Sequence, residues 1–364
     1  MPEPTTEQKC PACGAPLRFD PETGKLVCDY CGTVTEIAPE EAQAAAENAE
    51  TVLQGFDFNE ILQNSSSAKP AELPIYNCRS CGAEIIADPE TVSLTCPYCR
   101  NNIVLTQKVS GSLRPDAILP FKITPKMLPD VLTKFYADKK LLPKNFFTER
   151  TVGDVNGVYV PFWLFSGTVS GSLDYLGERV NTRTVGQYQI TDTAHYRLSR
   201  NVSMSFDSLP LDAAEKIEDE LMDSIQPYDY RELKPFDLRY LAGYTADRFD
   251  AAPRDIAVRA KERMVNSTQT LAGTEAGRDY LNVTPCGGNL MTRLSKVRYI
   301  LLPVYLFKME YKNKSYRFAV NGQTGKIIGE LPVGQKEKAS YFGKRAGIGA
   351  GIILLLSLLK YFFL

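Results

Sequence analysis

Eight of the nine cysteines in this chain fall into four Cys-x-x-Cys pairs, and the last two pairs repeat the first two at an offset of 68 residues. The eight residues are Cys10, Cys13, Cys28, Cys31, Cys78, Cys81, Cys96 and Cys99. Residues 10–31 and 78–99 match at 12 of 22 aligned positions, which indicates an internal duplication. The sequence therefore predicts two small metal-binding units near the start of the chain.

The spacing within each unit fits a site made of four thiolates. Two residues between cysteines let one tight turn present two thiolates to a single ion. Fourteen residues separate the two pairs of each unit, enough for a hairpin that brings the pairs together. Four protein ligands leave no open position for water or substrate, so we expect one structural zinc ion per unit. Disulfide-bonded hairpins, or a rubredoxin-like iron site, are the alternatives.

Glycines follow three of the four pairs and can take the positive φ that such turns require. They are Gly14, Gly32 and Gly82, whereas Arg100 follows the fourth pair. We therefore expect the turn at Arg100 to deviate most from the other three.

The C-terminal residues 346–364 are almost entirely apolar, with Lys360 as the one charged side chain. As a helix they would measure about 28 Å, close to the thickness of a bilayer's hydrocarbon core. Basic residues precede them, at Lys336, Lys338, Lys344 and Arg345. By the positive-inside rule, this pattern predicts a single transmembrane anchor inserted in the lipid bilayer, with the bulk of the protein in the cytoplasm. A buried terminal helix of a soluble protein is the alternative.

Two further observations bear on location and assembly. The N-terminus lacks the basic and apolar regions of a signal peptide, which agrees with zinc-binding thiols in a reducing cytoplasm. Gly343, Gly347 and Gly351 recur every fourth residue. This spacing lets two membrane helices approach closely, so it is compatible with a homo- or hetero-oligomer.

The charge distribution argues against nucleic acid as a partner. Residues 1–72 hold 13 acidic and 4 basic side chains, a net charge of −9, and residues 73–110 are neutral. Because Lys and Arg contacts with phosphate supply most non-specific affinity, neither unit suits a nucleic-acid backbone.

Residues 111–335 show alternating strand and helix patterns, and the predicted body is α+β with mainly antiparallel strands. Strand-like runs lie near 117–123, 157–165, 168–176, 184–206 and 297–331. Helices are predicted from Thr124 to Tyr136, from Asp212 to Pro227 with a capping box, and from Pro253 onward. The predicted divisions of the chain are 1–36 (first zinc ribbon), 37–72 (acidic helical linker), 73–110 (second ribbon), 111–335 (body) and 336–364 (basic flank and anchor).

A fainter repeat lies inside the body. Residues 160–165, VPFWLF, resemble residues 302–307, LPVYLF. Proline lacks the N–H of a central ladder, so Pro161 and Pro303 should mark an edge, a bulge or a strand start. Lys312 to Lys314 and Asn321 to Gly325 predict two hairpin turns.

The sequence contains no recognisable catalytic motif. His195 is the sole histidine, and it lies in a strand-like run without a nucleophile elbow elsewhere in the chain, so a structural role is favoured. Cys286 has no paired cysteine and falls in a predicted loop, where an ordinary free thiol is favoured. No phosphate-binding P-loop is found. These observations favour a protein that is not an enzyme, although a site built from Asp, Glu, Tyr and Lys in the body stays open.

The complete arrangement resembles bacterial membrane-anchored double zinc-ribbon proteins. The residues that carry the resemblance are CPACGAPL and CDYCG, CRSCGAE and CPYC, VPFWLF, LAGY at 241–244, VNGQTGK at 320–326 and the C-terminal segment. Such ribbons also occur in transcription and replication factors. The resemblance implies a recruiting or scaffolding role at the inner face of the cell membrane, for some relatives beside stomatin/flotillin-type (SPFH) and phage-shock-type membrane-stress proteins.

We therefore expect a membrane-tethered adaptor that presents its zinc ribbons to a protein partner. The alternative is a nucleic-acid-binding regulator held at the membrane, associated with replication or transcription.

Overall fold

The computed structural model describes residues 10–13, 15, 17–36, 70–71, 75–87, 93–104, 112–143, 146 and 155–363. The predicted acidic helical linker at 37–72, apart from residues 70–71, and the turn at Gly14 lie outside these residues.

Each cysteine unit is built on short antiparallel strands. In the first, β1 (Leu17–Asp20), β2 (Lys25–Cys28) and β3 (Val34–Thr35) form a three-stranded sheet. In the second, β5 (Ile75–Asn77) pairs with β6 (Glu84–Ile86), and β7 (Ser93–Thr95) pairs with β8 (Asn102–Val104). A further pair, β4 (Pro70–Ala71) with β9 (Ser112–Leu113), flanks the second unit in sequence.

The body is organised around one ten-stranded sheet. Its longest members are β11 (Asn156–Val185), β12 (Tyr188–Asp212) and β15 (Leu281–Tyr311). The shorter ones are β10 (Ala117–Ile118), β13 (Lys234–Pro235), β14 (Thr245–Asp247), β16 (Lys314–Asn321) and β17 (Ile327–Gly329), joined by β5 and β6 of the second cysteine unit. Most pairings are antiparallel, as predicted, but β10 with β15 and β11 with β14 are parallel.

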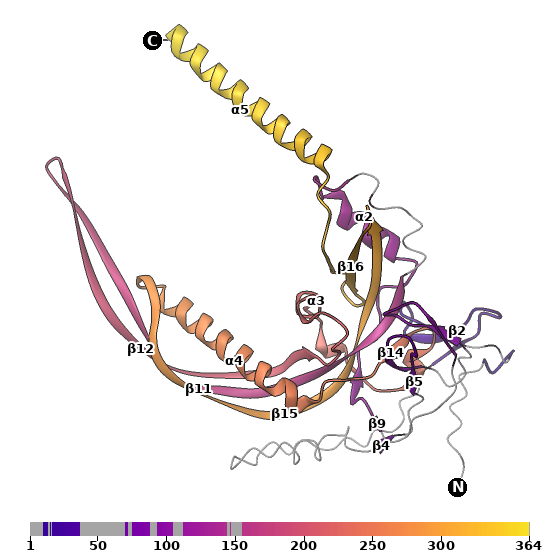
Figure 1. The fold of residues 1–364 in the computed structure, drawn as a ribbon. Helices are drawn as coiled ribbons and strands as arrows, with labels where there is room; N and C mark the ends of the chain where they lie inside the picture. The colour runs from indigo at the N-terminus through magenta and orange to yellow at the C-terminus, as the bar shows by residue number, and fades with distance from the viewer. Residues whose placement is uncertain are drawn as a thin grey trace.

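The three long strands extend from the body as a curved sheet, and α4 (Pro253–Ala276) lies along its concave side (Figure 1). Buried side chains recur along one face of α4, at Ile256, Ala260, Met264 and Thr268. They pack on the sheet because this period matches the turn of a helix. The helix predicted from Pro253 is thus confirmed.

Two of the other described helices are short. The prediction near 124–136 is confirmed by α2 (Leu128–Ala137), with proline in its first turn. The 3-10 turns are η3 (Tyr230–Glu232) and η4 (Leu238–Leu241). The helix predicted from Asp212 is wrong in its start, because α3 spans only Asp219–Ser224. Asp212 does not cap it. Its carboxylate lies 3.3 Å from the guanidinium of Arg259, and this ion pair takes the place of the predicted capping box.

The two similar proline segments lie side by side, since Val160 pairs with Leu302 in the β11–β15 ladder. The prediction that Pro161 and Pro303 mark an edge, bulge or strand start is wrong. Both lie inside long strands, where the neighbouring strand changes from β14 to β12 and from β10 to β16, respectively. No ladder donor is needed at such a change, so proline is tolerated.

The last element, α5 (Gln335–Phe363), extends away from the body (Figure 1). The fold class was predicted to include one C-terminal transmembrane helix, and this part is wrong. Among the residues that the structure describes, none of the helices is long and apolar enough to cross a membrane.

Candidate metal centres and their contacts with the body

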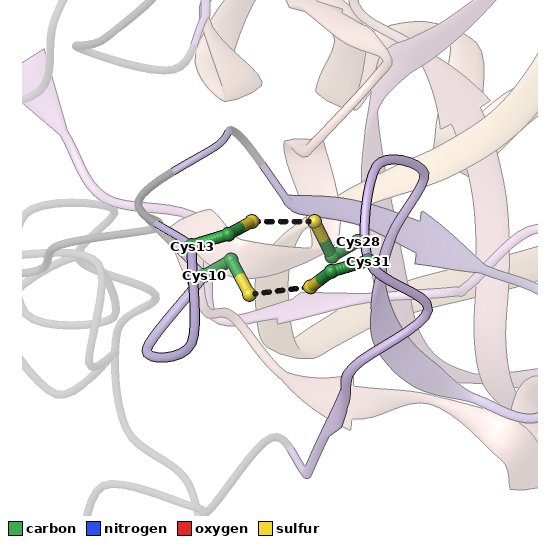
Figure 2. Close-up of side chains that lie close together, drawn as sticks. All are labelled: Cys10, Cys13, Cys28 and Cys31. Atoms are coloured by element: carbon green, nitrogen blue, oxygen red, sulfur yellow. Dashed lines mark hydrogen bonds between the residues drawn. The ribbon is translucent and has the colours of Figure 1, made fainter.

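The structure brings the eight predicted cysteines together in two groups of four, and in each group the ligand atoms lie within 4.8 Å of one another. In the first group, the turn carrying Cys10 and Cys13 faces the turn carrying Cys28 and Cys31 (Figure 2). The sulfur atoms of Cys10 and Cys31 are 3.4 Å apart, and those of Cys13 and Cys28 are 3.5 Å apart. The second group repeats this arrangement, with facing sulfurs 3.5 and 3.6 Å apart.

These distances fit zinc. Zn–S bonds of about 2.3 Å set the edge of a tetrahedron of sulfurs at roughly 3.8 Å, only slightly longer than the sulfur separations here. Each group offers four thiols and no other ligand type, the donor set of a closed structural site. The chain therefore has two four-cysteine groups positioned to bind zinc. The ions would hold the two turns of each unit together and would supply folding energy that such small units lack.

The thiols of the first group cannot all ionise without a cation. Burial opposes ionisation of Cys10, but the backbone N–H groups of Ala12 and Cys13 outweigh it and lower the pKa of Cys10 to about 6. At Cys13, the N–H of Ala15 lowers the pKa, but hydrogen bonds with Cys31 and Cys28 raise it to about 12. When a divalent cation binds, the thiols become thiolate ligands, and the cation replaces the protons that they shared.

The turns after the cysteine pairs follow one geometry. Gly32 and Gly82 both have φ +72°, and their N–H groups donate to the carbonyl oxygens of Cys28 and Cys78 at 2.9 and 2.7 Å. The prediction that the turn at Arg100 deviates is wrong. Arg100 takes φ +62°, and its N–H donates to the carbonyl oxygen of Cys96 at 3.0 Å. The turn closed by this backbone hydrogen bond imposes the left-handed conformation, at a cost of about 1–2 kcal/mol for a residue with a Cβ.

The first ribbon packs against the body through its hairpin. Phe19 is buried in the main core, and its ring lies 5.2 Å from that of Tyr240. The N–H of Phe19 donates to the carbonyl of Ala242 at 3.1 Å. The hairpin is thus part of the body's core, whereas both Cys13 and Cys31 are exposed.

The second ribbon is joined more closely, because β6 is a strand of the main sheet. Ala246 and Asp247 of β14 pair with Ile86 and Ile85 of β6. Arg248 donates from its N–H to the carbonyl of Glu84 at 2.9 Å and also forms an ion pair with the Glu84 carboxylate.

Tyr98, between Cys96 and Cys99, provides a further link. Its hydroxyl donates to the buried carboxylate of Asp247. Burial raises the pKa of Asp247 to about 7, although the hydrogen bond from Tyr98 opposes this. Neither Tyr98 nor Asp247 was predicted from the sequence to form this contact. Tyr98 could have been found, because it is one of the positions that match between the two repeats.

A pocket of about 260 Å³ lies between this turn and the body. Four basic side chains border it, Arg100, Lys216, Lys308 and Arg317, around an apolar base that includes Leu221 and Leu306. Glu218 also lines it and pairs with Arg317 at 3.0 Å. Its rim is therefore cationic.

The two residues considered for catalysis lie elsewhere. His195 is 72% exposed on β12, with its Nδ1 3.4 Å from Glu178. Cys286 is exposed within β15, so the loop predicted there is wrong. Neither lines the pocket.

Comparison with known proteins also identifies a zinc ribbon. A family model described as "TFIIB zinc-binding" matches residues 8–39, the first ribbon. The Bacillus subtilis (strain 168) protein named "Uncharacterized protein YdjG" is 32% identical over 355 residues, which cover 97% of this chain and 96% of the relative. This chain belongs to the YdjG family. No solved structure matches it significantly. The alignment with YdjG extends over both ribbons and the body, so the family shares more than the ribbon motif.

Proposed function

We propose that this YdjG-family protein is a zinc-ribbon adaptor that recruits a protein partner and carries out no reaction itself. Its zinc sites would be structural, since four cysteines close the coordination shell of each ion. What such a site can offer a partner is a rigid turn with fixed side chains. The expected place of recruitment, the cytoplasmic side of the cell membrane beside SPFH or phage-shock-type proteins, stays a prediction from the resemblance.

The observation that carries this proposal is the contrast between Tyr30 and Tyr98. They occupy the same position of the duplicated unit, one residue before the last cysteine. Tyr98 packs its turn against the body and donates to a buried carboxylate, whereas Tyr30 is 81% exposed. An exposed aromatic side chain on a rigid turn is typical of an interface anchor. By analogy with Tyr98, the partner of the first ribbon would offer Tyr30 a carboxylate set in an apolar surface.

The proposal is tested by affinity capture of the full-length chain from its own cells, with bound proteins identified by mass spectrometry. Tyr30→Ala should lose the partner and keep two zinc ions per chain, measured by atomic emission. Cys10→Ser should lose both the partner and one zinc ion. Val258→Ala is the control, because Val258 is 63% exposed on α4, outside both ribbons. A partner retained by both Tyr30→Ala and Cys10→Ser would refute recruitment through this turn.

The match to the TFIIB zinc-binding model favours a second candidate, a nucleic-acid-binding regulator. The described part of the first ribbon carries Arg18 and Lys25 against four acidic residues, Asp20, Glu22, Asp29 and Glu36. Such a surface repels phosphates. A salt-dependent gel shift of labelled DNA or RNA by the full chain, lost in Cys10→Ser, would replace the adaptor with this candidate.

A further inference from the structure

The end of the β11–β12 hairpin is a two-stranded arm. We define the arm as residues 179–194, which lie beyond the last pairing of β11 with β15, at Glu178 and Leu281. Figure 1 shows the hairpin projecting from the body at one end of the curved sheet. A two-stranded ribbon is marginally stable in water unless something packs on it.

Exposed apolar side chains concentrate on this arm and the residues next to it. They are Leu176, Val180, Val185, Tyr188, Ile190 and Tyr196. Such a concentration in one projecting hairpin indicates a surface that is covered in the working protein.

The outer edge of β12, from Tyr188 to Phe206, is open for pairing. In the described part of the chain β12 pairs with β11 alone. Edge strands are commonly protected from pairing by lysine, proline or bulges. Residues 188–206 contain neither lysine nor proline, and their register with β11 is regular from Tyr188 to Phe206. The opposite edge is protected, because β15 has Pro285, Gly288 at φ +133° and three register shifts against β11.

The register determines which residues face outward. Val185 and Tyr188 enclose a two-residue turn and therefore form a hydrogen-bonded pair. Even-numbered residues of β12 consequently direct their backbone groups to β11, and odd-numbered residues direct theirs to the free edge. A second strand can pair with this edge only by meeting the odd-numbered residues.

We propose that the outer edge of β12 pairs with the same edge of a second copy of this chain, antiparallel about a two-fold axis at Tyr196. In this register the residue numbers of each pair add to 392. Odd-numbered residues therefore meet odd-numbered residues, whose backbone groups point to the free edge of each strand. Asp192 lies opposite Arg200 of the other copy, and Arg200 opposite its Asp192. Two strands related by such an axis form each contact twice.

The same register matches the apolar side chains. Tyr188 and Ile190 of one arm lie opposite Met204 and Val202 of the other copy, which are half-buried beside α4. These even-numbered positions are non-hydrogen-bonded pairs, in which side chains are closest. A shift by two residues in either strand separates Asp192 from Arg200, so charge selects this register. Asp192 also lies 3.8 Å from Arg183 in its own arm. Both side chains of this pair are exposed, so Asp192 is accessible to the second copy.

The first test is cross-linking of the full-length chain in a Cys286→Ser background, which leaves only the zinc-ligand cysteines. Tyr196→Cys should form a disulfide-linked dimer on mild oxidation, because Cα atoms at a non-hydrogen-bonded pair lie within disulfide range. Val180→Cys is the matched control. Val180 is as exposed as Tyr196, 40% against 39%, but lies on β11, on the other strand of the arm from the proposed contact. Equal cross-linking at both positions, or none at Tyr196→Cys, would overturn the proposal.

The second test measures the dimer by light scattering after size-exclusion chromatography. Thr193→Pro removes an outward N–H that β11 does not use, so it should give a monomer with an unchanged circular dichroism spectrum. Asp192→Arg and Arg200→Asp should each weaken dimerisation by roughly tenfold, and the double variant should restore it. A wild-type monomer, or a dimer indifferent to Thr193→Pro, would show that this edge is not the interface.

Discussion

Individual residues in this protein are best understood by comparing the two copies of the cysteine unit. Tyr30 and Tyr98 both stand directly before the last cysteine of their unit, but only Tyr98 meets a carboxylate of the body. Their difference in exposure therefore comes from the surroundings of the ribbons and not from the ribbons themselves.

Asp212 provides a prediction about pH. Burial raises its pKa to about 7, Asp219 raises it further, and Arg259 opposes the shift. The stability that depends on protonated Asp212 is fully present below about pH 4, and it is lost as the pH rises through 7. Asp212→Asn does not titrate, so its free energy of unfolding should improve relative to wild type between pH 4 and 8, on the order of 2–4 kcal/mol.

Urea denaturation at several pH values measures this difference. The exposed Asp130→Asn serves as the control and should run parallel to wild type. A constant difference between Asp212→Asn and wild type across the range would contradict the raised pKa.

The sequence predicted the zinc ligands completely, because the spacing of cysteines is a local pattern that the coordination geometry dictates. It could not predict Asp247 as the partner of Tyr98, since the two lie 149 residues apart and nothing local connects them. Arg100 shows the converse: local propensity disfavours its φ, and the turn overrides it.

Among the elements, the long strands depend on glycine where two of them approach each other closely. Gly171 of β11 has φ +148°, and an added Cβ would collide with the backbone oxygen of Asn289 on β15. Gly171→Ala should therefore reduce the free energy of unfolding by roughly 3 kcal/mol, from strain and overpacking together. Gly186→Ala, at the turn of the hairpin, meets no atom within 4 Å and should cost only the strain of its φ of +66°, about 1 kcal/mol.

Thermal unfolding followed by circular dichroism would rank these two variants. Equal losses at Gly171 and Gly186 would mean that close approach between β11 and β15 contributes nothing.

Elements were predicted well where one local period dominates and poorly where neighbours decide. The face of α4 at Ile256, Ala260 and Met264 was evident from the sequence, and so were the turns at Lys312 and Asn321. The runs at 157–165 and 168–176 were expected as separate strands but form one strand, β11. Both runs pair with β15 along their whole length, and this pairing joins them into one strand. No local sequence pattern indicates such a pairing.

At the scale of the molecule, the second ribbon contributes strands to the main sheet, whereas the first ribbon joins the body through side chains in its core. Removing zinc should therefore destabilise the main sheet through β6 and β14. We expect Cys78→Ser to lower the melting temperature of the body more than Cys10→Ser, although each removes one zinc ion.

Differential scanning calorimetry of both variants, with chelator-treated wild type for comparison, checks this order. The reverse order, or a body transition unaffected by Cys78→Ser, would show that the ribbon and the sheet unfold independently.

The pairing of β6 with β14 also has a consequence for synthesis. The ribosome makes Ile86 about 160 residues before Ala246, a delay of roughly 8–30 s at ordinary bacterial elongation rates. During this interval the second ribbon can bind zinc and fold alone, and it then offers a finished strand to the rest of the sheet as it emerges. In a zinc-starved cell the same chain would emerge with an unpaired sheet edge, so the supply of metal at the moment of translation would help decide how much protein matures.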